Sequence, residues 1–132
     1  MERSPQVEQL AIAWLAGMKA GDAVAVGGLF VENEAATVIG NGAEQWFTGD
    51  AYTTKRLDDS LGEHRGIPFE PGSPTGWAAG DTGWFANRVT LVVPAKTIPL
   101  RVTGVPIRQD STWRLVQLHV SAAVSDEDLL AS

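Results

Sequence analysis

The sequence predicts an α+β protein in which three N-terminal helices pack on one face of a curved, mostly antiparallel sheet. In the first half of the chain, apolar residues recur at the spacing of amphipathic helices. The second half contains long runs in which apolar and polar residues alternate, and tight turns separate these runs. Such runs are typical of antiparallel strands, which present one drier and one more polar face. Helices followed by a meander of strands therefore indicate this fold class.

Length and composition limit the kind of protein. The 132 residues are expected to form a single domain, 1–132, with one core. The formal net charge of −6 argues against nucleic acid and against a membrane surface as partners, because both attract clustered Lys and Arg. The first residues lack the apolar run of a signal peptide. No run approaches the ~20 apolar residues of a membrane span. We therefore expect a cytoplasmic protein.

Three helices are expected before the strands. The first covers residues 5–20, with Ser4 as its N-cap and Gly21 as its C-terminal stop. The second covers about 22–31 and begins at an aspartate cap, but two glycines weaken it. The third covers about 49–65, and its last turn carries a histidine and an arginine that suit the helix dipole. Together these helices supply the layer that the sheet needs to bury its apolar face.

The strands are short before the third helix and long after it. We expect strands at 35–39, 45–47, 77–79, 83–93, 98–109 and 112–121. Residues 67–76, rich in proline and glycine, are expected to be loop. Asp110 and Ser111 form the turn of the final hairpin. The segment after Ser125 either starts a helix or frays.

Strict alternation assigns the side chains of the last strand to two faces. One set is Val116, Leu118 and Val120, and the other is Trp113, Leu115, Gln117, His119 and Ser121. The first set is more apolar, so we expect it to face the helices. His119 would then face outward, toward a partner subunit, as a hydrogen-bonded interface residue rather than a catalytic one.

Three segments carry a resemblance to one superfamily. Residues 113–121 are similar to the Trp-x-x-Val-x-x-His-x-Ser strand of the association domain of calcium/calmodulin-dependent kinases. Residues 101–103 resemble the Arg-x-Thr of SnoaL-like proteins, and residues 37–50 resemble the stretch between their second and third helices. The chain thus resembles the nuclear transport factor 2-like superfamily, in particular its SnoaL-like branch.

The resemblance implies a cone-shaped fold with a pocket at its open end, and a dimer formed through the other face of the sheet. The superfamily includes isomerases, cyclases, dehydratases, binding proteins and scaffolds, so the fold does not settle the function. In its ketosteroid isomerases a carboxylate follows the strand after the second helix. Gly40 falls at that position here and cannot accept a proton, which argues against that type of isomerase chemistry.

Arg88 is the polar residue that the resemblance points to. The kinase association domains line their pocket with arginines from three strands, and in this chain one falls on Arg88 and the other two on Gly104 and Val120. A guanidinium could bind an acidic or carbonyl group of a small hydrophobic or weakly acidic ligand. Alternatively, Arg88 pairs with a core carboxylate or reaches solvent. The ligand-binding residues expected with it are Trp14, Trp46, Tyr52, Trp84, Val102 and Val120.

The remaining candidates concern the interface and cofactors. Trp113, His119 and Ser121 are expected at the interface of a homodimer. Two histidines, distant in sequence, and the absence of cysteine indicate no metal site. The glycine-rich turns at residues 40–42 and 80–83 lack the following Lys-Ser/Thr and the helix of a phosphate loop, so no cofactor is expected.

Three functions remain open at this point. The first is a small-molecule binding protein with a mostly apolar pocket anchored by Arg88. The second is an isomerase, cyclase or dehydratase acting on a hydrophobic carbonyl compound, with acid–base help from Tyr52 or His119. The third is an assembly module, with a filled cone and an apolar face made by Trp113, Leu115, Val89 and Leu91. Whether the protein is an enzyme is left undecided.

Overall fold

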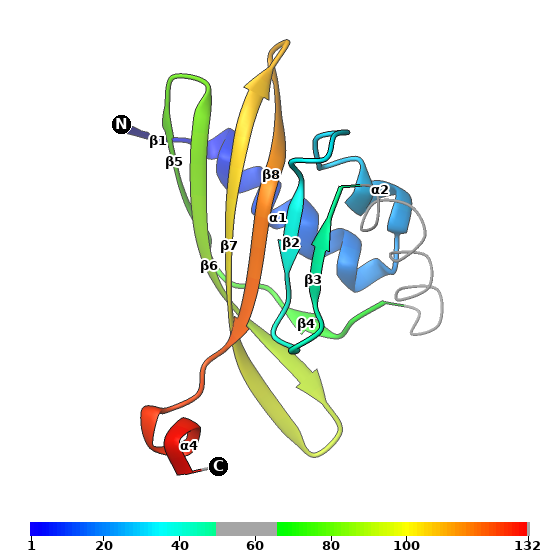
Figure 1. Cartoon of the computed structure of the whole chain (residues 1–132), viewed down its shortest axis with the longest axis vertical. Coiled ribbons are helices and arrows are strands. Elements are labelled where there is room, and N and C mark those ends of the chain that lie inside the picture. Colours follow the sequence, from blue (N-terminus) through cyan, green and yellow to red (C-terminus); the bar gives the residue numbers. More distant parts are fainter. Residues whose placement is uncertain (50–65, 132) are drawn as a thin grey trace.

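The computed structural model describes residues 1–49 and 66–131. Its helices are α1 (Pro5–Ala20), α2 (Ala23–Gly27) and α4 (Asp126–Ala131). Its strands are β1 (Glu2–Arg3), β2 (Thr37–Ile39), β3 (Trp46–Thr48), β4 (Phe69–Glu70), β5 (Thr75–Ala79), β6 (Thr82–Val93), β7 (Lys96–Gln109) and β8 (Thr112–Ala122). The strands form one curved sheet in the order β1-β5-β6-β7-β8-β2-β3, with β4 paired to β6, and α1 crosses one face of it (Figure 1). The α+β class with a curved open sheet is confirmed.

Helix α1 has the ends that the sequence predicts. The Ser4 side chain accepts a hydrogen bond from the backbone N–H of Val7 at 3.2 Å. Pro5 occupies the first turn, where its missing N–H costs nothing. Gly21 ends the helix with a positive φ of 71°, and its N–H bonds back to the carbonyl of Met18. One side of α1 is buried against the sheet, through Val7, Leu10, Ala11, Trp14 and Leu15.

The second helix is shorter than predicted. Asp22 caps it by accepting a hydrogen bond from the N–H of Ala25 at 3.0 Å, but the helix ends at Gly27. The two glycines at 27 and 28 lower helix propensity, and the chain turns from there into the sheet, where Phe30 makes a parallel bridge with Leu115. The predicted third helix falls on residues 50–65, which lie outside the described residues, so three N-terminal helices are not confirmed.

The sheet contains pairings that alternation alone does not reveal. β1 pairs with β5, although the first residues show no strand pattern. β4 forms inside the segment predicted to be loop, where Phe69 pairs with Leu91 of β6. β2 runs parallel to β8, with Val38 opposite Leu118. These short strands depend on long-range partners, which is why a local pattern misses them.

A β-bulge interrupts the β7–β8 hairpin. The turn itself is as predicted, since Asp110 and Ser111 both have positive φ, 51° and 65°. The register then shifts between Val105, opposite Gln117, and Pro106, opposite Leu115. The extra residue on β8 is Val116, so side chains before and after it change faces. The strict alternation predicted for this strand is therefore wrong.

The sheet has an inner face, against α1, and an outer face. Buried residues on the inner face come from every long strand, and they are Phe85, Val89, Leu100, Val102, Leu115 and Leu118. Gly104 lies on the inner face opposite Phe85, where a side chain would collide with the Phe85 ring. The outer face has no helix over it in the described residues (Figure 1). None of the helices in the described ranges is long and apolar enough to cross a membrane.

Candidate functional site

An apolar cavity of about 230 Å³ lies between α1 and the inner face of the sheet. Residues from α1, the β-strands and the loop before β4 converge on it. They are Trp14, Met18, Val38, Gly40, Asn41, Gln45, Phe47, Ile67, Phe69, Leu91, Leu100, Leu118 and Val120. An apolar wall with a few polar groups at one edge is typical of a small-molecule site.

The walls of the cavity are held by packing and pairing. Val38 on β2 lies between Phe47 on β3 and Leu118 on β8, so the three side chains share the inner face. On the helix side, the Trp14 and Phe69 rings pack with centroids 6.0 Å apart. The N–H of Ile67 bonds to the carbonyl of Met18 at 2.9 Å and fixes the loop to the end of α1. The cavity is thus bounded by elements that are each tied to the core.

Gly40 allows the Gln45 side chain to form part of the cavity's edge. The N–H of Gly40 donates to the carbonyl of Gln45 at 2.7 Å, and the N–H of Gly42 donates to Gln45 Oε1 at 2.9 Å. A Cβ at position 40 would lie 2.8 Å from the Gln45 Cβ and closer still to its Oε1. The space that a carboxylate would need at this position is therefore filled by the glutamine.

Trp14 contributes the one buried polar side-chain atom without a partner among the described residues that line the cavity. Its side chain is 3% exposed, and its Nε1–H has no hydrogen-bond partner. A buried donor left unpaired costs roughly 1–3 kcal/mol, so a native structure that retains one invites an explanation. None of the described lining residues has a titratable side chain.

The structure places Arg88 and Trp84 away from the cavity. On β6 the buried side chains are Phe85, Asn87 and Val89, so the residues between them face outward. Trp84 pairs with Trp77 across β5, and exposed Arg88 pairs with Arg101 across β7. This register places Trp84 and Arg88 on the same outer face, so the prediction that they line the pocket is wrong.

The other predicted pocket residues also fall into two groups, those that lie at or beside the cavity and those that do not. Trp14 and Val120 line the cavity, and Val102 faces inward but is only 2% exposed and lies in the core beside it. Trp46 is 66% exposed, because strand alternation turns Phe47 inward in its place. Tyr52 lies outside the described residues. A ligand role for any of these residues stays a prediction.

The predicted interface residues also separate. His119 and Ser121 lie on the outer face, with His119 exposed and opposite Thr103. Trp113 precedes the bulge and packs against the core, so its prediction as an outer-face residue is wrong. The apolar outer face predicted for an assembly module is also wrong. Leu115 is fully buried, and Val89 and Leu91 belong to the inner face. His119 is not among the residues that line the cavity.

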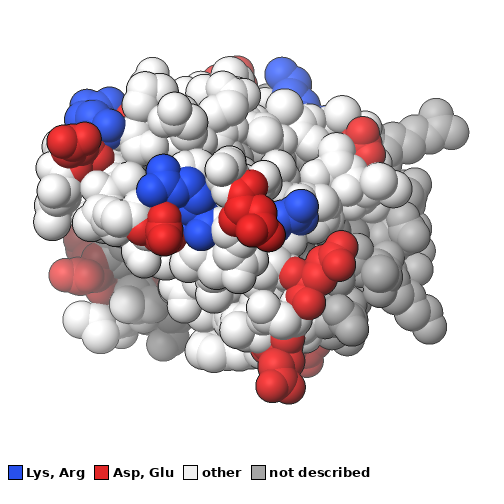
Figure 2. Space-filling view, turned by 90° about the horizontal axis from the view of Figure 1, so that it is seen from above, with Lys and Arg blue, Asp and Glu red and all other residues white. Residues whose placement is uncertain are grey.

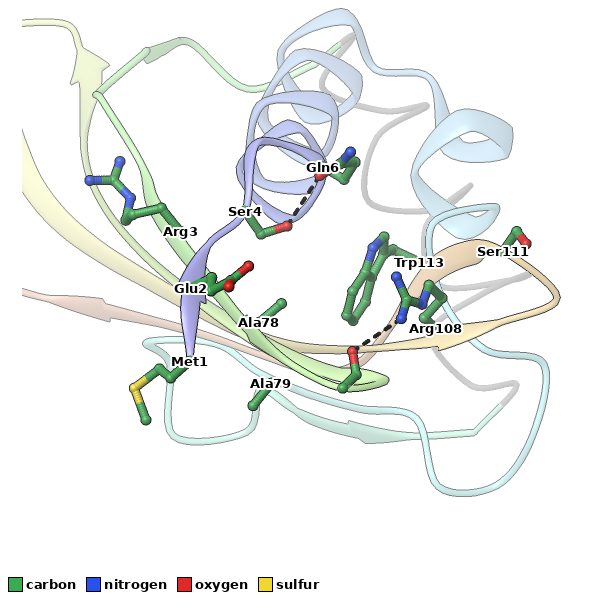
Figure 3. Close-up of a pocket in the computed structure, with 11 residues that line it drawn as sticks. Met1, Glu2, Arg3, Ser4, Gln6, Ala78, Ala79, Arg108, Ser111 and Trp113 are labelled. Atoms are coloured by element: carbon green, nitrogen blue, oxygen red, sulfur yellow. Dashed lines mark hydrogen bonds between the residues drawn. The ribbon is translucent and has the colours of Figure 1, made fainter.

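A larger hollow, the end cleft, lies between the N terminus and the β7–β8 hairpin. Its volume is about 630 Å³, and Trp113 and Arg108 face Ser4 and Gln6 across it (Figure 3). Its Arg108 is paired with Asp81 at 3.0 Å. Positive and negative side chains lie next to each other over this end of the molecule (Figure 2). Because both arginines that line the cleft, Arg3 and Arg108, are paired with carboxylates, the apolar cavity is the better candidate site.

Arg3 and Glu8 form the second ion pair of this end, 2.6 Å apart. The Arg3 guanidinium donates to Glu8 Oε2, and so does the backbone N–H of Gly76 at 2.8 Å. These donors, Arg3 first, lower the pKa of the Glu8 carboxyl below its usual value. The pair joins β1, α1 and β5 and has a structural role.

Several lining residues were not predicted. Leu91, the lining residue from β6, could have been found, because the inward residues Phe85, Val89 and Leu91 are together more apolar than Trp84, Ala86 and Arg88. Phe69 could not, since it lies in a segment without periodicity. Met18 belongs to the apolar stripe predicted for the first helix, but nothing local distinguishes a cavity wall from core.

The family follows from a comparison with protein-family models. Residues 7–125 match the model of the SnoaL-like domain. This match spans most of the chain, and the chain belongs to the SnoaL-like domain family. None of the proteins with curated descriptions matches the sequence.

Solved structures with the same fold include proteins of different descriptions. A nuclear transport factor 2-like protein of unknown function from Pseudomonas putida KT2440 is similar at 19% identity and a TM-score of 0.78, covering 96% of this chain and 93% of that one. A candidate dehydratase of the same family from Streptomyces avermitilis matches at 17% identity and 0.75, covering 91% and 95%. A candidate calcium/calmodulin-dependent protein kinase type II association domain from Thiobacillus denitrificans matches at 16% and 0.72, covering 94% and 100%. At these identities the likeness establishes the fold alone.

Proposed function

We propose that this protein binds a small, mostly apolar molecule in the cavity between α1 and the inner face of the sheet. The observation that carries the proposal is an apolar cavity of about 230 Å³ whose wall includes Trp14 with an unpaired indole N–H. The ligand would bury apolar surface against Phe47, Phe69 and Leu118, which is the main source of affinity in such a site.

The polar groups suggest what else the ligand carries. The Trp14 Nε1–H is buried under its neighbours, so an oxygen of a ketone, ester or carboxylic acid would reach it when the indole turns toward the cavity, and would then satisfy an otherwise unpaired donor. Asn41 and Gln45 lie at the polar edge of the cavity, where a second polar group of the ligand could remain near solvent. This arrangement favours an apolar body with at least one hydrogen-bond acceptor.

The test is a thermal-shift screen against hydrophobic carboxylates, ketones and polyketide-like compounds. A ligand at about one hundred times its Kd stabilises the native state by about 2.7 kcal/mol. Val120→Phe places a larger side chain in the cavity and should abolish the shift. Arg88→Ala, on the outer face, should retain it. A hit that is lost in Arg88→Ala and retained in Val120→Phe would move the site to the outer face and overturn the proposal.

A second candidate is a dehydratase or isomerase that acts on a hydrophobic carbonyl compound. It is supported by the fold shared with the candidate dehydratase and by the same apolar cavity. It needs an acid–base group within hydrogen-bond reach of the ligand. The described lining supplies none, and His119 lies on the other face of the sheet. Conversion of a binding hit into a product, followed by mass spectrometry and lost in Val120→Phe, would favour this candidate over binding alone.

We also propose that the protein forms a homodimer through the outer face of the sheet. Strand register gathers apolar side chains there, namely Ile39, Trp46, Trp77, Trp84, Val105 and Ile107. His119 and Ser121 lie on the same face. Apolar side chains gathered on the uncovered face of a sheet are typical of an interaction site. Sedimentation equilibrium over a range of concentrations should show a dimer, and a monomer at every concentration would overturn this proposal.

A further inference from the structure

The C-terminal segment, residues 123–131, stands apart from the rest of the protein. Every residue in it is exposed, and α4 lies past the end of β8, to one side of the sheet (Figure 1). Its first turn carries Asp126, Glu127 and Asp128, and no residue of α4 is buried. Leu130 is 82% exposed at the other end of the helix. A short helix is marginal in water unless it packs on something, and the residues of α4 are all exposed here.

The outer face of the sheet carries two arginines directly opposite each other. Arg88 on β6 and Arg101 on β7 form a cross-strand pair, and both are exposed. Like charges in this position destabilise a sheet unless something compensates them. Arg101 donates to Ser121 Oγ at 3.2 Å and to the carbonyl of Ala122 at 3.5 Å, and both acceptors are uncharged. Among the described residues, neither arginine forms an ion pair.

The segment leaves the sheet close to this arginine pair. Ser121 is opposite Arg101 in the register, and the N–H of Ala123 donates to the carbonyl of Pro99 at 2.9 Å. The three acids of α4 therefore follow the arginine row by only a few residues, yet they form no ion pair with it within their own chain. The charges are complementary, and the segment that carries the negative charge projects away from the body.

We propose that residues 123–131 of each copy dock on the outer face of a second copy, with the α4 acids against Arg88 and Arg101. This inference rests on the homodimer proposed above. A two-fold axis makes the contact reciprocal, so a dimer contains it twice. The acids neutralise the opposed arginines, and Leu130 contributes apolar contact to the neighbouring outer face. The segment then acts as a clamp that fixes partner and orientation by charge.

A charge-exchange experiment tests this directly. One variant reverses the face, Arg88→Glu with Arg101→Glu, and the other reverses the tail, Asp126→Lys with Glu127→Lys and Asp128→Lys. All five positions are exposed, so both variants should fold as the wild type does by circular dichroism. In the homodimer of either variant, both tails meet a face of the same charge as their own. The dimer Kd of each variant should therefore rise at least about tenfold.

The mixture of the two variants decides the question. In a heterodimer each tail meets a face of opposite charge, so equimolar mixing should restore a dimer Kd within about threefold of the wild-type value. A tail that docks on its own chain gives no recovery on mixing, and that result overturns the proposal. The matched control is Glu32→Lys with Glu34→Lys, exposed acids elsewhere on the surface, which should leave the dimer Kd unchanged.

Failure of the tail contact can be distinguished from failure of the dimer and of the ligand binding proposed above. If the wild type dimerises while both variants dimerise equally well, the tail contact is wrong and the sheet-face dimer stands. If the wild type is monomeric at every concentration, both fall. Ligand binding in the cavity is read out by thermal shift in the same variants, and it should be unchanged because none of the altered residues lines the cavity.

Discussion

Trp14 connects the stability of the core with the chemistry of the cavity. Trp14→Ala should destabilise the protein by about 3–5 kcal/mol, because it removes a large buried side chain. Trp14→Phe should change the free energy of unfolding by no more than about 1 kcal/mol, since the lost area is offset by removal of an unpaired buried donor. Urea denaturation checks both values. A loss in Trp14→Phe as large as in Trp14→Ala would show that the indole N–H has a partner in the unliganded protein.

Glu8 provides a prediction about pH. Its pKa is lowered in the folded state, so its contribution to stability is fully present above the usual glutamate pKa and is lost as pH falls through the lowered folded value. Glu8→Gln removes the titrating group but keeps an acceptor for Arg3 and Gly76. The difference in the midpoint of thermal unfolding between wild type and Glu8→Gln should therefore shrink as pH falls from about 7 to about 3. A difference that is constant over this range would contradict the assignment.

Gly104 on β7 matters for packing across the sheet, because its missing side chain leaves room for the ring of Phe85 on the neighbouring strand β6. A Cβ at position 104 would meet the Phe85 ring and lie 3.1 Å from Leu115 Cδ2, and both side chains are buried. Gly104→Ala should cost about 1–3 kcal/mol of stability through overpacking. The matched control is Gly28→Ala, where the nearest atom is a backbone oxygen at 3.4 Å. An equal effect of the two changes would argue against close packing at Gly104.

Elements defined by local signals could be predicted, and elements defined by distant partners could not. The ends of α1 follow from Ser4, Pro5 and Gly21, and the hairpin turn follows from its two positive-φ residues. β1 and β4 are two residues long and exist only because β5 and β6 offer a free edge. The bulge at Val116 has no signature in the alternation that it interrupts, so the faces of the last strand were partly misassigned.

The candidate site was predicted in part, for a related physical reason. Strand side chains alternate with a period of two, so an error of one residue moves a whole set to the other face. Trp46 and Trp84 are large aromatic residues that suit a pocket by composition, yet alternation places Phe47 and Phe85 inward. Arg88 moves outward with Trp84. Trp14 and Val120 line the cavity, but the unpaired indole N–H can be recognised only in three dimensions.

At the scale of the whole molecule, the sheet separates the proposed ligand site from the proposed dimer contact. The cavity lies on its inner face and the proposed dimer contact on its outer face, so each can be altered alone. Trp84→Glu places a charge among the outer-face aromatic residues and should raise the dimer Kd at least about tenfold. The same variant should keep ligand binding, whereas Val120→Phe should do the reverse. Loss of both properties in either variant would indicate coupling between the faces.

The most direct measurement of the central claim is a nitrogen–proton correlation spectrum of the indole groups during titration with a hit compound. The protein has five tryptophans, and the signal missing in Trp14→Phe identifies Trp14. Binding in the cavity with an oxygen on the Trp14 Nε1–H should shift that signal downfield and leave the exposed Trp46 signal in place. A bound compound that leaves the Trp14 signal unmoved while shifting Trp46, Trp77 or Trp84 would contradict the claim.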